Sequence, residues 1–84
     1  MKACELYLVL PSIHYVLEAE ELLQEAGIAC DLRPMPRTIS SNCGMCLVSS
    51  RQELPRIRKA LDRMAGEAEL AIFIKETPTA FRRL

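Results

Sequence analysis

The sequence predicts an α+β fold of the ferredoxin-like, split β-α-β-β-α-β type, with a four-stranded antiparallel sheet and two helices on one face. The chain divides into two similar halves, each with a short apolar run, a stretch of helical periodicity and a second apolar run. Its 84 residues, 50% of them hydrophobic, suit one small domain with a core that needs no disulfide. We expect this domain to span residues 1–76, followed by a C-terminal tail at 77–84.

The first half predicts a strand, a helix and a second strand. "CELYLVL" (4–10) is short and rich in β-forming residues. Ser12 can cap the helix that follows, and Gly27 can end it. "IACDLR" (28–33) alternates in the way of a half-buried strand. One arc of the predicted helix is apolar and should face the sheet: Tyr15, Val16, Ala19, Leu22, Leu23 and Ala26.

The second half repeats this plan. "GMCLVS" (44–49) is typical of a strand, and "SRQE" (50–53) matches a capping box before a helix that keeps its periodicity up to Gly66. "AELAIFIK" (68–75) predicts the last strand. Right-handed crossovers then place the first and third strands in the middle of the sheet, and bring residues 11–14 and 36–44 to the same edge.

Charge and hydropathy narrow the function classes. Eleven basic residues balance eleven acidic ones, which argues against nucleic acid as a partner. The opening "MKACELYLVL" is too short for a membrane span and is interrupted by Glu5. Four cysteines beside an ordinary core do not indicate a disulfide scaffold. We therefore expect a soluble, cytoplasmic protein with mostly reduced cysteines, no cofactor and no membrane partner.

The connection between the second and third strands is the candidate functional site. Residues 34–43 are more than a hairpin needs, and long loops in compact domains are usually functional or disordered; Pro34 and Pro36 stiffen this one. Cys43 ends the loop, and the nearby helix N-terminus and arginine could lower its pKa from about 8.5 to near 7. We predict a nucleophilic, partly exposed Cys43; the alternative is a small apolar filler. The residues expected around it are Arg37, Ser40, Ser41, Asn42, Gly44, Ser12 and His14.

The other cysteines and the histidine keep several interpretations. Cys4 and Cys30 fall in predicted strands and are expected to be buried fillers. Cys46 completes a CxxC pair with Cys43, yet residues three apart in a strand point to opposite faces. It could be a core filler, a resolving thiol for Cys43, or a soft-metal ligand, for example for Cu(I). His14 could shuttle protons beside Cys43 or be a solvated residue paired with a glutamate one turn later.

The sheet face away from the helices predicts a partner surface. Tyr7, Val9, Ala71 and Phe73 should point from the first and last strands into an apolar patch that a domain of this size cannot cover. We expect a homodimer through this exposed face. The alternative is a tail that covers the patch with Phe81 and Leu84.

"PRTISSNCG" (36–44) resembles the P-R-x-I-S-S-x-C-G loop of the small selenium/sulfur carrier protein-like family, long described as a domain of unknown function. The order of elements in "VLPSIHYVLEAEELLQEAGIACDLRPMPRTISSNCGMCL" is similar as well. The resemblance implies that Cys43 is the carrier thiol, with Arg37, Ser40, Ser41 and Gly44 around it. Cys46 departs from the pattern, because an apolar strand residue usually stands there.

Together these features predict a carrier or accessory protein rather than a stand-alone enzyme. Cys43 would accept sulfur or selenium from a donor protein as a persulfide or its selenium analogue and pass it to an acceptor protein. A second reading is a non-catalytic, oligomeric regulatory or adaptor domain. In that case Arg37 and the serines of the loop would bind a small anion or a protein partner.

Overall fold

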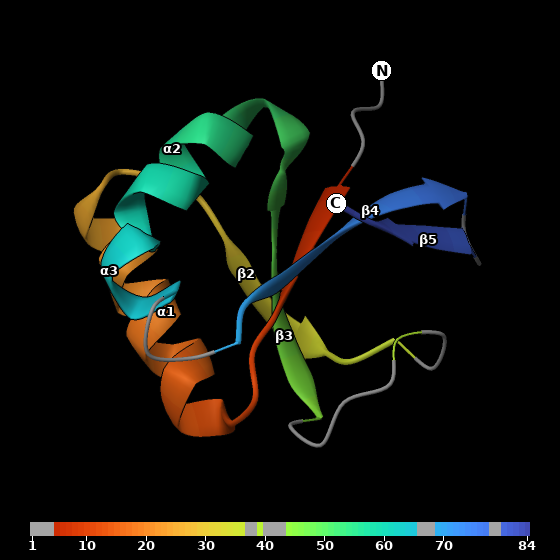
Figure 1. The fold of residues 1–84 in the computed structure, drawn as a ribbon, viewed down its shortest axis with the longest axis horizontal. Helices are drawn as coiled ribbons and strands as arrows, with labels where there is room; N and C mark the ends of the chain where they lie inside the picture. Colours follow the sequence, from red (N-terminus) through yellow and green to blue (C-terminus); the bar gives the residue numbers. More distant parts are fainter. Residues whose placement is uncertain (1–4, 37–38, 40–43, 66–68, 78–79) are drawn as a thin grey trace.

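The computed structural model describes residues 5–36, 39, 44–65, 69–77 and 80–84. Figure 1 shows helices stacked against one side of a twisted sheet. The elements in chain order are β1 (Glu5–Val9), α1 (Ile13–Glu25), β2 (Asp31–Pro34), β3 (Met45–Ser50), the 3₁₀ turn η1 (Arg51–Glu53), α2 (Leu54–Ala60), α3 (Asp62–Ala65), β4 (Ala71–Thr77) and β5 (Ala80–Arg83).

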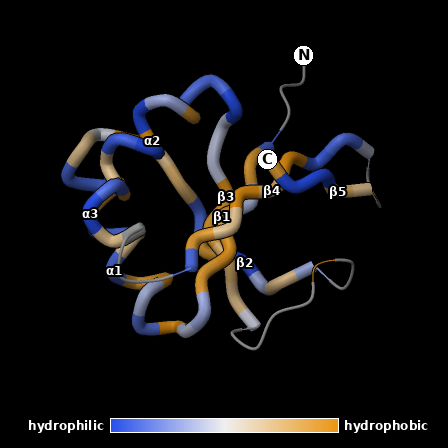
Figure 2. The backbone as a smooth tube through the Cα atoms, viewed as in Figure 1, coloured by the Kyte–Doolittle hydropathy of each residue, from blue (hydrophilic) through white to orange (hydrophobic). Residues whose placement is uncertain are grey.

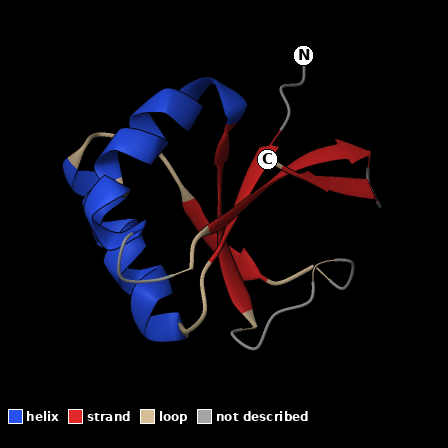
Figure 3. Cartoon of the chain, in the orientation of Figure 1, coloured by secondary structure: helices blue, strands red, loops and turns tan. Residues whose placement is uncertain are grey.

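The sheet has five strands in the order β2-β3-β1-β4-β5, and every neighbouring pair is antiparallel. The predicted α+β class and antiparallel sheet are confirmed, but the prediction of four strands is wrong. The expected C-terminal tail contains β5, which pairs with β4 from Phe73↔Arg83 to Thr77↔Ala80. β4 and β5 thus form an antiparallel pair at one edge of the sheet (Figure 3).

Local signals set the helix boundaries. The Ser12 hydroxyl accepts a hydrogen bond from the Tyr15 amide at 3.5 Å, which confirms the predicted N-cap of α1. Gly27 has φ +75° directly after the helix, a conformation that favours glycine. Ser50 accepts from the Gln52 amide at 3.3 Å and caps η1, so the predicted second helix is divided into η1, α2 and α3.

The main core lies between the helices and the sheet. From α1 it takes Val16, Ala19 and Leu23, three members of the predicted arc, whereas Ala26 is exposed. Figure 2 shows the apolar strands at the centre of the molecule. The buried members of this core are Leu6, Leu8, Leu10, Val16, Ala19, Leu23, Ile28, Leu47, Ile57, Leu61, Met64, Ile72 and Ile74.

β2 is shorter than the predicted 28–33 strand and is an edge strand, bonded only to β3. Ile28 is buried but lies before the strand, and Leu32 remains 37% exposed. Cys30 lies before the strand and is half-buried against the main core, so it packs as an apolar side chain but is not the fully buried strand residue predicted. The physical reason is its position beside β2, which lies at the edge of the described sheet.

A second apolar cluster lies on the sheet face away from the helices. Tyr7 and Val9 are 5% and 8% exposed there, so these two do not form the open patch we expected. Phe81 of β5 packs edge-on against Tyr7 with ring centroids 4.9 Å apart. Phe81 thus covers part of this face, as the alternative interpretation held, whereas Leu84 is 40% exposed and lies outside the cluster. The cluster consists of Tyr7, Val9, Ile39, Cys46 and Val48, with Met35, Ala71, Phe73 and Phe81 packed against it.

Across the part of the chain that the structure describes, no helix is both long enough and apolar enough to cross a lipid bilayer.

Candidate functional site

The loop between β2 and β3 holds most of the predicted site. Arg37, Ser40, Ser41, Asn42 and Cys43 lie outside the described residues, as does Cys4. The described part consists of Met35, Pro36, Ile39 and Gly44. The Met35 amide donates to the Gly44 carbonyl at 2.9 Å, and the Ile39 amide donates to the Pro36 carbonyl at 3.0 Å. The first bond joins Met35, directly after β2, to Gly44, directly before β3, and so holds the two ends of the loop together.

Ile39 anchors this loop to the sheet. Its side chain is only 4% exposed and belongs to the second apolar cluster. It contacts the face that β1 and β3 turn away from the helices, and it is an apolar residue in an otherwise polar run. The buried side chain of Ile39 therefore anchors the loop to the sheet.

Cys46 lies in the same cluster. Its side chain has 0% exposure, and its Sγ is 3.8 Å from the Pro34 carbonyl oxygen, to which it can donate a weak hydrogen bond. In the β2–β3 ladder it stands opposite Arg33. This packing is that of a small apolar residue, which favours the filler interpretation among the three proposed from the sequence.

Gly44 connects the loop to β3. It is exposed and has φ +82°, in the region that side chains with a Cβ avoid. A Cβ at this position would meet nothing within 4 Å. The glycine is therefore needed for the turn of the backbone.

Ser12 and His14 stand on the other side of the sheet from Ile39. Leu8 pairs with Leu47, so the end of β1 and the start of β3 lie at the same end of the sheet, as predicted. Ser12 is occupied as a helix cap. His14 is exposed, and its ring packs edge-on to Tyr15 at 5.6 Å between centroids. The observed contacts of both residues are within α1.

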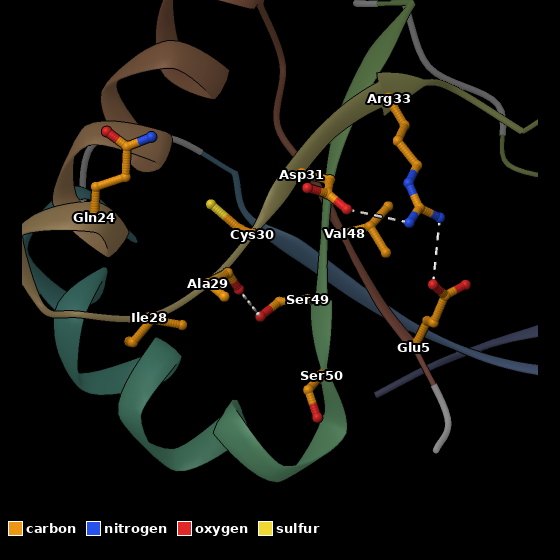
Figure 4. Close-up of a pocket in the computed structure, with 10 residues that line it drawn as sticks. All are labelled: Glu5, Gln24, Ile28, Ala29, Cys30, Asp31, Arg33, Val48, Ser49 and Ser50. Atoms are coloured by element: carbon orange, nitrogen blue, oxygen red, sulfur yellow. Dashed lines mark hydrogen bonds and ion pairs between the residues drawn. The ribbon is translucent and has the colours of Figure 1, made fainter. Parts of the chain in front are cut away.

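A pocket of about 570 Å³ lies beside the edge strand β2, and sequence reasoning did not predict it. Figure 4 shows Cys30 near Gln24 on one side and the Arg33 ion pairs on the other. The Ser49 hydroxyl donates a hydrogen bond to the Ala29 carbonyl at 2.7 Å, which links two of the residues that line the pocket. The lining residues are Glu5, Gln24, Ile28, Ala29, Cys30, Asp31, Arg33, Val48, Ser49 and Ser50.

The charges of this pocket work against a reactive thiol. Burial raises the pKa of Cys30, and the negative charges of Glu20 and Asp31 raise it further. Arg33 lies 3.3 Å from Glu5 and 3.2 Å from Asp31. Partial burial alone would lower the pKa of Arg33, but its bonds to these two carboxylates outweigh that effect and raise it. The Arg33 charge is thus already neutralised by two partners.

A metal centre would need several ligands close together. Within the described ranges, no group of three or more histidine, cysteine, aspartate or glutamate side chains could hold a metal ion. Of the CxxC pair only Cys46 is described, and its surroundings are apolar.

Comparison with known proteins places the chain. A family model described as "Putative Se/S carrier protein-like" matches residues 5–78, from the start of β1 past the end of β4. No curated protein and no solved structure matches the chain. The matched region contains the whole cysteine loop, both helical segments and four of the five strands. The chain therefore belongs to the Se/S carrier protein-like family.

Proposed function

We propose that the protein carries sulfur or selenium on Cys43. The Cys43 thiolate attacks the terminal sulfur of a donor persulfide, R–S–SH, and displaces R–S⁻. This forms the S–S bond of Cys43–S–SH and breaks that of the donor, so no external oxidant or reductant is needed. A nucleophilic group of an acceptor protein then takes the terminal sulfur and releases the Cys43 thiolate. Selenium transfer follows the same balance with R–S–SeH.

The observation that carries this proposal is the environment of the two described cysteines. Cys46 is fully buried among apolar side chains, and the pKa of Cys30 is raised. The thiolate is the nucleophile, so the raised pKa disfavours attack by Cys30, and the full burial of Cys46 keeps its sulfur from a donor protein. Cys43 is the cysteine that lies within the family motif, in the loop that Ile39 and Gly44 position.

Arg37 and the loop serines have a defined role in this scheme. The terminal –S⁻ or –Se⁻ of the carried group is an anion, and a guanidinium with hydroxyl donors stabilises such a charge. Donor and acceptor proteins are its expected partners, because a carrier must be loaded and unloaded.

Intact-protein mass spectrometry tests the proposal. The reduced protein is incubated with a cysteine desulfurase and cysteine, which supply a protein persulfide, or with a perselenide donor, R–S–SeH, and we expect a mass gain of one sulfur or one selenium atom. Cys43→Ser should abolish this gain, whereas the matched control Cys30→Ser should keep it. An adduct that survives Cys43→Ser refutes the carrier role. Anion binding without any adduct would instead support the adaptor function, with the anion held by Arg37 and the serines.

A further inference from the structure

The helical layer is divided into an acidic and a basic half. α1 contains four glutamates and neither lysine nor arginine. The segment from η1 to α3 contains five basic residues and two acidic ones. The glutamates are Glu18, Glu20, Glu21 and Glu25; the basic residues are Arg51, Arg56, Arg58, Lys59 and Arg63, beside Glu53 and Asp62.

The two halves do not neutralise each other through ion pairs within the chain. Among the described residues of the helical layer, one basic side chain forms an ion pair. It is Arg56, whose guanidinium nitrogen lies 2.8 Å from a carboxylate oxygen of Glu53 in the same segment. Its second nitrogen donates to the Ala26 carbonyl, also at 2.8 Å. Glu21 and Glu25 on α1 are exposed and, in the described part of the chain, form no ion pair. The same holds for Lys59 and Arg63.

The layer also exposes apolar side chains. Ile13 and Leu17 of α1 are 45% and 48% exposed, although both are large. A shallow depression of about 600 Å³ lies over the same helix, lined by His14, Leu17, Glu18, Glu20, Glu21 and Gln24. The opposite face of the sheet is partly closed by Phe81, Met35 and Ile39. Two of the four large apolar side chains that are exposed in the described part of the chain, Ile13 and Leu17, thus lie on α1.

We propose that this layer is a self-complementary surface that binds a second copy of the chain. A two-fold axis between α1 and α2 places the acidic α1 of each copy against the basic α2–α3 segment of the other. Each contact between opposite charges then occurs twice. The net charge of the chain is zero, so no overall repulsion opposes association. This interface uses a different face from the sheet-face dimer expected from the sequence and does not depend on the carrier function.

The charges predict how the dimer responds to salt. Exposed ion pairs are weak one by one and are screened beyond a Debye length of about 10 Å at 0.1 M salt. We expect sedimentation velocity to show a weak dimer at low salt whose dissociation constant rises about tenfold or more when salt is high.

Charge reversal makes the test specific. Glu21→Lys with Glu25→Lys removes the net negative charge of α1, and Lys59→Glu with Arg63→Glu changes the net charge of the segment from η1 to α3 from +3 to −1. Each variant alone should be monomeric. An equimolar mixture should restore a dimer, because the reversed positions of one variant then face those of the other with opposite charges, and the second contact of the two-fold pair keeps its original charges. Circular dichroism and urea unfolding confirm that each variant folds.

Matched controls reverse charges away from the layer. Glu69→Lys and Arg83→Glu change exposed residues outside the helices and should leave the dissociation constant unchanged. The proposal is overturned if the wild-type chain is monomeric at low salt. The helical layer would then be a surface for a different protein. The proposal is also overturned if both reversed variants remain dimeric, as association through the sheet face would give, or if their mixture stays monomeric.

Discussion

Replacing Ile39 by alanine tests whether the cysteine loop is held by burial. Ile39 is 4% exposed, and the substitution removes roughly three methylene equivalents at about 0.8 kcal/mol each, or about 2.4 kcal/mol in total. A rigid core would add a term for the cavity left behind, but a loop can partly collapse onto the sheet. We therefore expect a loss of about 2–3 kcal/mol from the free energy of unfolding.

Urea unfolding followed by circular dichroism measures this loss. A domain of 84 residues has a total stability of about 4–13 kcal/mol, so the variant should still fold. With an m-value of roughly 1.5 kcal/mol per molar urea, the transition midpoint should fall by about 1.5 M. Ile39→Val, which removes one methylene equivalent, should lower the stability by about 0.5–1.5 kcal/mol.

Leu32→Ala is the matched control, because Leu32 is a large apolar residue next to the same loop but 37% exposed. Its loss should stay below about 1 kcal/mol, since little apolar area is removed from the interior. If Ile39→Ala costs no more than Leu32→Ala, the loop is not anchored by Ile39.

Three further substitutions test other parts of the fold. Phe81→Ala should lower the free energy of unfolding by about 1–3 kcal/mol, because it removes the edge-on contact with Tyr7. Arg83→Ala on the same strand should lower it by less than about 0.5 kcal/mol. Equal losses in urea unfolding would refute the role of the aromatic pair. Gly44→Ala should cost about 1–2 kcal/mol because of its positive φ alone; an unchanged midpoint would contradict the observed turn. The raised pKa of Cys30 stabilises the fold below the ordinary thiol pKa of about 8.5, and this contribution is lost as pH rises through the higher folded value. The unfolding free energy of Cys30→Ser should fall less steeply above about pH 8.5 than that of the wild type, and parallel curves would exclude the effect.

The sequence predicted elements that are determined locally. The first helix followed from a cap at Ser12, a 3.6-residue period and a glycine at its end, and all three act within one element. β5 was missed because Ala80–Arg83 is short, exposed and basic. Its stability comes from pairing with β4 and from the contact of Phe81 with Tyr7, which lies far away in the sequence. Such tertiary contacts are not encoded in local propensity.

The candidate site shows the same division. Strand alternation raised the question of whether Cys46 faces Cys43, and alternation along β3 places Cys46 with Val48 on the face away from the helices, opposite Leu47. Ile39 was not singled out, although a lone isoleucine within "PRTISSNCG" was a usable signal: an apolar side chain in a polar loop needs somewhere to be buried. The face that receives it could not be predicted, because it depends on β5 covering part of the sheet.

The two faces of the sheet therefore serve different purposes. The helical face contains most of the buried core and, outside it, charges without partners in the described chain. The other face joins the anchor of the cysteine loop, the second cysteine of the CxxC pair and the last strand in a single apolar cluster. A residue of this cluster acts on the loop through packing, so a change at Tyr7 or Phe81 reaches the loop through Ile39. The dimer proposed above uses the helical face, so it does not cover this cluster.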